Sequence, residues 1–146
     1  MIKNNKLIFS LIFNIIGISM IFLGIGWMFV EEPWLLDKVA NEERLGMSFD
    51  ELFSNEINKT LPGYLKQIYS FFGLWVIIIG LFITLLSRQK ISQNKDIRLI
   101  LLICTACMIL PGLMLGYILI PSSPFIYFGW LLIILYLISL YNQFHY

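Results

Sequence analysis

The sequence has few charged side chains, and this scarcity decides the class of protein. Of its 146 residues only 13% are charged, whereas 59% are hydrophobic and the mean hydropathy is +0.83. A water-soluble domain carries about 25% charged residues. The composition therefore excludes a soluble enzyme and predicts an integral membrane protein.

Charge is also missing from long continuous stretches. None occurs at 7–30 or at 67–87, and no Asp, Glu, Lys or Arg follows Arg98. A helix needs about 20 apolar residues to cross a bilayer. The last stretch is too long for one span, and Pro-Ser-Ser-Pro at 121–124 divides it as a turn. We therefore predict an all-α integral membrane four-helix bundle, a single domain of residues 1–146 with spans at about 7–30, 65–86, 99–120 and 125–141, an outer segment at 31–64 and a cytoplasmic loop at 87–98.

Residues that commonly carry ion or redox chemistry are scarce as well. Apart from Lys66 at the outer start of the second span, no acidic or basic residue lies inside a predicted span, although such residues normally couple ion movement across a membrane. The single histidine, His145, excludes a pair of His ligands for haem and a His-rich metal cluster. Nucleotide-binding loops, nucleophile elbows and nucleic-acid motifs are absent. We expect no ion-coupled pump acting alone, no cofactor, no metal and no nucleic-acid partner.

The only cysteines, Cys104 and Cys107, form a C-x-x-C pattern that invites a redox interpretation. They lie about two helical turns inside an apolar span, away from the helix N-terminus and the cations that make thiols reactive. The sequence holds no second pair to relay electrons. We predict that both are buried thiols with a packing role.

The distribution of charge predicts the orientation. Six of the ten basic residues lie in the N-terminal tail and in 87–98, whereas eight of the nine acids lie between Glu31 and Lys66. Lys and Arg in short loops are retained in the cytoplasm. We expect a multi-pass protein of the cell membrane, the inner membrane in a bacterium, with both termini cytoplasmic. The first apolar run exceeds the roughly 7–15 residues of a signal-peptide core, so we interpret it as a retained anchor.

The outer segment is predicted to hold two short amphipathic helices. Pro33 suits the first turn of one helix, and Ser48 with Glu51 forms a capping box that begins the other. Four apolar residues fall on one face of the second helix: Phe49, Leu52, Phe53 and Ile57. The segment either rests this face on the membrane interface or offers residues 31–64 to another membrane or extracytoplasmic protein. The pair Glu31-Glu32, at the membrane surface, is interpreted as solvated charge.

Glycines recur at helical spacing in three of the predicted spans. Small residues let helices approach closely in lipid, where no hydrophobic force drives them together. The first two spans are expected to pack against each other along these positions, and the third carries a G-x-x-x-G pattern. The predicted packing residues are Gly17, Gly24, Gly73, Gly80, Gly112 and Gly116.

Polar side chains collect in the cytoplasmic half of the membrane. At a rise of 1.5 Å per residue, Asn14, Thr105 and Tyr136 each lie roughly 10 Å inside the cytoplasmic boundary. One interpretation is hydrogen bonding between helices. The other is a small amphipathic pocket for a quinone-like or lipid-like molecule. These three are the candidate ligand-binding residues, and no catalytic residue is predicted.

The architecture resembles the DoxX-like group of small bacterial membrane proteins. The similarity lies in the four spans, the outer connection after the first, and a second span from Tyr64 to Leu81 with a basic residue at its outer start and glycines seven apart. Some members are linked to quinone-dependent oxidation, so the resemblance implies a membrane-embedded, quinone-linked oxidoreductase component as one function. The residues themselves favour a non-enzymatic accessory or small-ligand-binding bundle. Neither function assigns a catalytic residue.

Overall fold

The structure is a computed structural model that describes residues 2–144, with side chains described from Lys6 to Gln143. Its four long helices are α1 (Ile2–Phe29), α4 (Leu61–Leu86), α5 (Lys95–Leu119) and α6 (Phe125–Phe144). Each is long and apolar enough to cross a membrane. The described residues contain no strand, so the predicted all-α membrane bundle is confirmed, and the chain is a multi-pass membrane protein. His145 lies outside the described residues.

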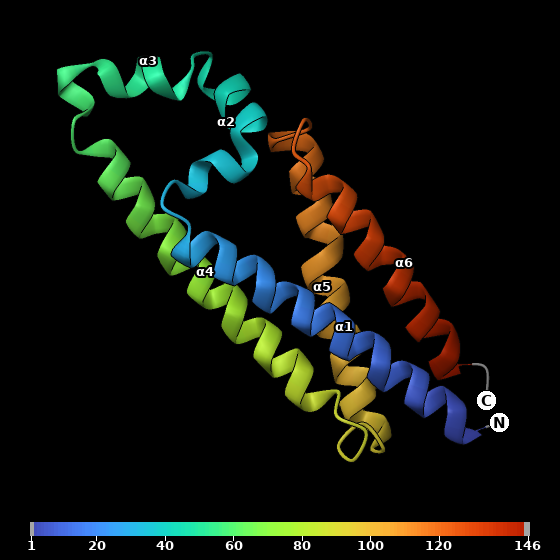
Figure 1. The fold of residues 1–146 in the computed structure, drawn as a ribbon. Helices are drawn as coiled ribbons and strands as arrows, with labels where there is room; N and C mark the ends of the chain where they lie inside the picture. The colour runs from blue at the N-terminus through green and yellow to red at the C-terminus, as the bar shows by residue number, and fades with distance from the viewer. Residues whose placement is uncertain (1, 145–146) are drawn as a thin grey trace.

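The connections alternate between two ends of the bundle (Figure 1). The N-terminus, the loop at 87–94 and the C-terminal end of α6 lie together at one end, which we call the basic end. The segment at 30–60 and the turn at 120–124 lie at the other, which we call the acidic end. These names describe charge alone and leave the side of the membrane open.

Like α1, the helices α4 and α5 begin earlier than the hydropathy of the sequence predicts. α4 begins at Leu61 because Pro62 fits the first helical turn, where a missing N–H costs nothing. α5 begins at Lys95 because the side chain of Asn94 caps it, accepting a hydrogen bond of 2.8 Å from the backbone N–H of Asp96. Both helices therefore extend beyond their apolar runs.

The closest helix pair is α1 with α4, which make the most extensive contact in the described chain. The two backbones touch at glycines. A Cβ atom added to Gly17 would lie 2.8 Å from the carbonyl oxygen of Gly80, and one added to Gly24 would lie 2.6 Å from that of Gly73. A larger residue at any of these four positions would force the helices apart, so glycine sets their separation.

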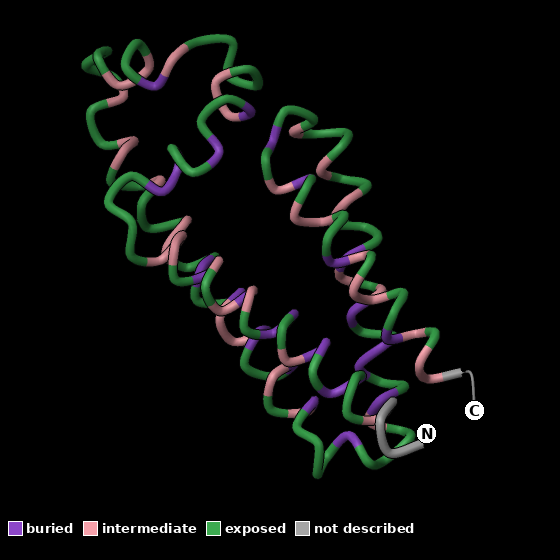
Figure 2. The backbone as a smooth tube through the Cα atoms, turned by 45° about the vertical axis from the view of Figure 1, so that its right-hand side comes forward, coloured by how far each residue is buried: buried purple, intermediate pink, exposed green. Residues whose placement is uncertain are grey.

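Most core residues lie in the half of the bundle nearer the basic end. On α1, Phe9, Phe13 and Ile16 are each at most 1% exposed, and they belong to one cluster with Leu101 and Leu102 of α5. Toward the acidic end, the α1–α4 pair and the α5–α6 pair diverge (Figure 2). One half of the bundle is thus tightly packed, and in the other half the backbones of the two helix pairs separate.

A buried arginine fixes the connection at the basic end. Arg98 is 9% exposed, and its Nη1 donates hydrogen bonds to the carbonyl oxygens of Ser92 (2.6 Å) and Gln93 (3.0 Å). Its Nε donates to Oε1 of Gln143 on α6 at 2.6 Å. The Arg98 side chain therefore ties the 87–94 loop to both α5 and α6.

The segment at the acidic end contains η1 (Pro33–Asp37), α2 (Lys38–Leu45), α3 (Phe49–Ser54) and η2 (Glu56–Asn58). The helix starts at Pro33 and Ser48 are confirmed, and Oγ of Ser48 accepts a hydrogen bond of 3.2 Å from Glu51 N–H. The placement of Ile57 on the apolar face is wrong. α3 ends at Ser54 and Asn55 caps a separate turn, which leaves Ile57 85% exposed.

Candidate functional site

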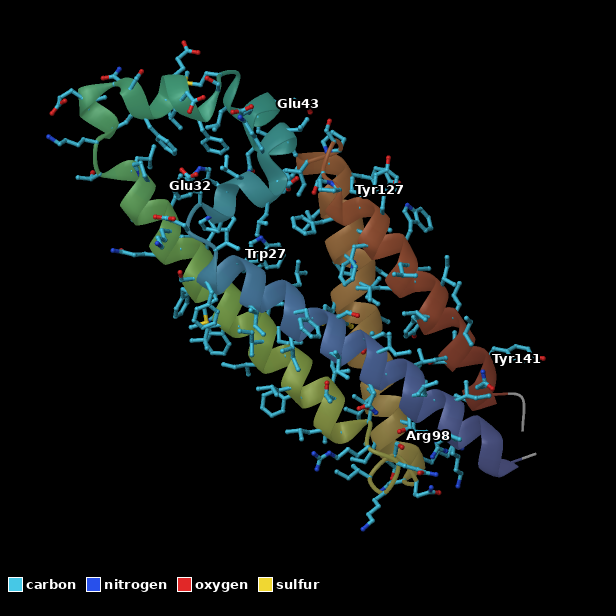
Figure 3. The ribbon with its side chains drawn as sticks, viewed as in Figure 1. Trp27, Glu32, Glu43, Arg98, Tyr127 and Tyr141 are labelled. Carbon is cyan, nitrogen blue, oxygen red and sulfur yellow. The ribbon has the colours of Figure 1, made fainter. Side chains whose placement is uncertain are left out.

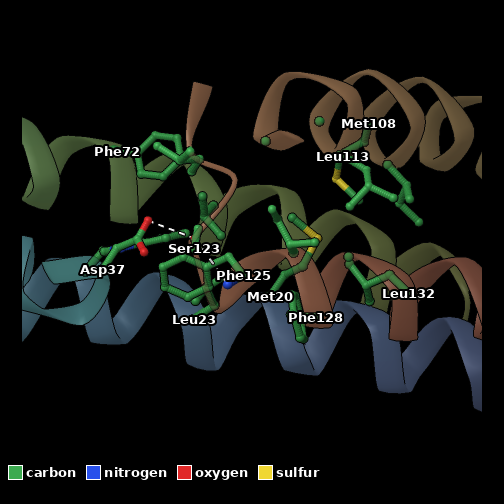
Figure 4. Close-up of a pocket in the computed structure, with 18 of the residues that line it drawn as sticks. Met20, Leu23, Asp37, Phe72, Met108, Leu113, Ser123, Phe125, Phe128 and Leu132 are labelled. Atoms are coloured by element: carbon green, nitrogen blue, oxygen red, sulfur yellow. Dashed lines mark hydrogen bonds between the residues drawn. The ribbon is translucent and has the colours of Figure 1, made fainter. Parts of the chain in front are cut away.

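A cavity of about 530 Å³ lies between the two helix pairs, toward the acidic end (Figure 4). Small-molecule sites in proteins commonly enclose about 300–1,000 Å³, so a small ligand fits. All four long helices contribute to its walls, which are mostly apolar. Wall residues include Met20 and Leu23 of α1, Val76 of α4, Leu113 of α5 and Phe128 and Leu132 of α6.

Four polar residues gather at the end of the cavity nearest the 30–60 segment: Asp37, Asn41, Tyr69 and Ser123. The hydroxyl of Ser123 donates a buried hydrogen bond of 2.9 Å to Oδ2 of Asp37 (Figure 4). The amide of Asn41 donates to the carbonyl oxygen of Trp34 at 3.0 Å and to the hydroxyl of Tyr69 at 3.3 Å. The cavity therefore has one polar end and an apolar body.

The Asp37 side chain is the charged group of this polar end. It is 8% exposed, and the short helix Pro33–Asp37 that carries it also buries Pro33 and Trp34. Burial raises the pKa of the Asp37 carboxyl above its ordinary value, while the hydrogen bond from Ser123 acts in the opposite direction. Oδ1 of Asp37 is buried and has no hydrogen-bond partner among the described residues.

Two serine–carboxylate pairs attach the 30–60 segment to the turn before α6. Besides the Ser123–Asp37 pair, the hydroxyl of Ser122 donates to Oε2 of Glu43, which lies beside that turn (Figure 3). Trp27 projects from the end of α1 beneath the same segment (Figure 3). The segment is thereby held over the acidic end of the cavity.

The three residues predicted to bind a ligand do not line this cavity. The Asn14 amide donates to the carbonyl oxygen of Ser10, one turn earlier in its own helix, at 2.7 Å. Thr105 is 1% exposed, and its hydroxyl has no partner among the described residues. Tyr136 packs against the core cluster. All three residues lie in the packed half of the bundle, whereas the cavity lies in the other half.

The glycines of α5 behave differently from those of α1 and α4. A Cβ atom at Gly112 would meet nothing within 4 Å, and one at Gly116 would lie at an ordinary distance of 3.7 Å from Ile126. Both residues line the cavity. They therefore contribute space for a ligand, whereas Gly17, Gly24, Gly73 and Gly80 bring two helices into contact.

The predicted burial of Cys104 and Cys107 is wrong. Both thiols are free and exposed on the outer surface of α5. The inward-facing position between them belongs to Thr105, because residues one and two positions away on a helix point in different directions.

Within the described residues no three His, Cys, Asp or Glu side chains are grouped to hold a metal ion.

Sequence reasoning missed Asp37 as a site residue, although a signal was present. The pair Glu31-Glu32, which the sequence predicts to be solvated, is exposed. Asp37, however, lies three residues after Trp34 and four before Asn41, which is helical spacing. An acid on the same face as a buried tryptophan indicates a carboxylate that points into the protein.

Comparison with protein-family models, with curated proteins and with solved structures finds no match for this chain.

Proposed function

We propose that this chain is a non-enzymatic membrane protein that binds one small amphipathic molecule in the cavity between its helix pairs. The observation that carries the proposal is the 530 Å³ space itself, with apolar walls and a single polar end at Asp37 and Ser123. A ligand with an apolar body and a polar head matches this division. We therefore propose a binding site at the acidic end, away from Asn14, Thr105 and Tyr136.

Charge supports the proposed orientation in the cell membrane. The basic tail and the basic loop lie at one end of the bundle (Figure 1), as a protein with cytoplasmic termini requires. The polar end of the cavity, beneath the 30–60 segment, would then lie on the outer side of the membrane. Two variants test the orientation, Glu31→Cys and Lys90→Cys, each made in a chain that lacks Cys104 and Cys107. In intact cells a membrane-impermeant maleimide should label Glu31→Cys and should not label Lys90→Cys.

Ligand retention tests the proposed function directly. The chain, purified in mild detergent, should release one amphipathic molecule in near-stoichiometric amount on organic extraction, identified by mass spectrometry. Gly112→Leu should lose it, because the new side chain enters open space in the cavity wall. Gly63→Leu is the matched control, since Gly63 is equally unobstructed but lies outside the cavity.

Two results would decide against a dedicated site. Release of bulk lipid alone, or equal retention by Gly112→Leu and the unchanged chain, would overturn the proposal. A quinone in the extract would instead favour the alternative of a quinone-linked oxidoreductase component, which the DoxX-like resemblance implies. That resemblance itself remains a prediction.

A further inference from the structure

The polar end of the cavity contains a carboxylate oxygen that lacks a donor. Ser123 satisfies Oδ2 of Asp37, whereas Oδ1 is buried without a partner among the described residues. Leaving a buried charged acceptor unsatisfied costs more free energy than leaving a neutral one. Among the described lining residues there is no Lys or Arg to supply the missing donor. A ligand that donates a hydrogen bond there would recover this free energy.

The neighbours of Asp37 supply no compensating positive charge. On α4, the hydroxyl of Tyr69 accepts a hydrogen bond from the side-chain amide of Asn41. The Oδ1 of the same amide is a further acceptor at this end. On α2, the Lys38 ammonium lies 3.7 Å from Glu42 and does not line the cavity. Apart from the O–H of Tyr69, which accepts from Asn41 and can itself donate, the polar end presents acceptors and negative charge to whatever enters.

An aromatic wall lies next to these acceptors. The Trp27 ring centroid is 4.9 Å from that of Phe72 and 5.0 Å from that of Phe125, and all three residues line the cavity. Aromatic faces attract cations, most strongly when water is excluded. Beyond this wall the cavity continues between apolar side chains such as Met20, Met108 and Leu132 (Figure 4).

We infer that the occupant is a hydrophobic amine, a protonated amino group on an apolar body, whose N–H donates to the Asp37 carboxylate while the body fills the space between the helix pairs. The inference rests on the proposed function and names its ligand class. A neutral quinone or alcohol would leave the carboxylate without a countercharge. A fatty acid would place a second negative charge beside it, which is unfavourable at low dielectric.

The probes are three molecules with the same ten-carbon chain: decylamine, decanol and decanoate. Equilibrium binding is measured in phosphatidylcholine nanodiscs, with partition into empty nanodiscs subtracted. The unchanged chain should bind decylamine roughly tenfold more tightly than decanol, which corresponds to about 1.4 kcal/mol, and decanoate more weakly still. In Asp37→Asn the Kd values for amine and alcohol should differ by less than about twofold.

Glu43→Gln is the matched control, because it removes one negative charge from the same segment outside the cavity wall. It should keep the preference for the amine. Equal affinities for decylamine and decanol in the unchanged chain, or a preference that survives Asp37→Asn, would overturn the inference. If Asp37→Asn does not fold, the order of the three probes in the unchanged chain still decides it.

Gly112→Leu separates the two proposals. If amine and alcohol bind the unchanged chain equally and both are lost in Gly112→Leu, the cavity binds amphiphiles without selecting an amine. If Gly112→Leu binds both probes as the unchanged chain does, the proposed function itself fails. Adding phosphatidylethanolamine to the nanodiscs identifies the source of the amine: competition with decylamine indicates a lipid headgroup, and its absence indicates a free amine.

Discussion

The hydroxyl of Ser123 donates a hydrogen bond of 2.9 Å to Oδ2 of Asp37, across 86 positions in sequence. This bond joins the turn between α5 and α6 to the segment that follows α1. The two helix pairs diverge at this end (Figure 1), so the contact bridges them where their helices do not. It also holds the buried carboxylate at the end of the cavity.

Ser123→Ala should destabilise the protein measurably. A hydrogen bond to a charged group contributes about 1.5–3 kcal/mol, and its removal leaves both oxygens of the buried Asp37 without a partner. Unfolding in mixed micelles with increasing SDS measures the loss. Ser122→Ala is the control: its bond to Glu43 is exposed, so it should change the free energy of unfolding by no more than about 0.5 kcal/mol. Equal losses in the two variants would contradict the role of the Ser123–Asp37 bond.

The stability of the empty protein should fall as pH rises through the titration of Asp37. Burial raises the pKa of this carboxyl in the folded chain, so the folded state retains a proton at pH values where the unfolded state, with an ordinary pKa of about 3.9, has lost it. Stability then decreases with rising pH between the ordinary and the raised pKa, since the unfolded state binds fewer protons there.

Asp37→Asn isolates this contribution, because all other carboxyl groups remain in both chains. Of the titratable groups around it, Tyr69 on α4 interacts electrostatically with Asp37, and Lys38, the next residue in the chain, pairs with Glu42 on α2. The unfolding free energy of the unchanged chain minus that of Asp37→Asn, measured from about pH 4 to pH 7, should decrease with pH. A difference that stays constant or increases would refute the direction assigned to the Asp37 pKa.

The helices could be predicted from sequence because each depends on neighbouring residues. The charge-free runs determine the four long helices, and Ser48 begins α3 through a bond to Glu51, only three positions away. The length of an apolar helix face also depends on the residue at which the helix ends. Ile57 was misplaced because Asn55 interrupts the helix before it.

The candidate site could not be predicted in the same way, because it depends on contacts between distant segments. Asp37 becomes a site residue only where it meets Ser123, and the cavity exists only because two helix pairs diverge. Depth in the membrane does not show which partner a polar side chain has, since a polar side chain in a helix can bond to its own backbone. Asn14 does so, at the carbonyl oxygen of Ser10.

Gly80→Ala should destabilise the α1–α4 contact. The added Cβ would lie 2.6 Å from the carbonyl oxygen of Gly17, which is backbone and cannot move independently of α1. Overpacking of this kind costs about 1–3 kcal/mol. The control is Gly112→Ala, which meets nothing within 4 Å and should gain about 0.5–1 kcal/mol from reduced backbone entropy in the unfolded state. Equal unfolding free energies for the two variants would contradict the close helix contact.

Arg98→Ala should loosen the loop at the basic end. Its guanidinium donates to the carbonyl oxygens of Ser92 and Gln93 and to the side chain of Gln143, and losing these bonds costs about 1–3 kcal/mol. Trypsin should then cleave faster after Lys90, which is exposed in the loop. Lys95→Ala removes an exposed cation from the adjacent helix start and should leave that cleavage rate unchanged. Because cleavage reports local opening, an unchanged rate in Arg98→Ala would show that the loop is held by other contacts, such as the 2.6 Å bond from Ser10 to the carbonyl oxygen of Ser87.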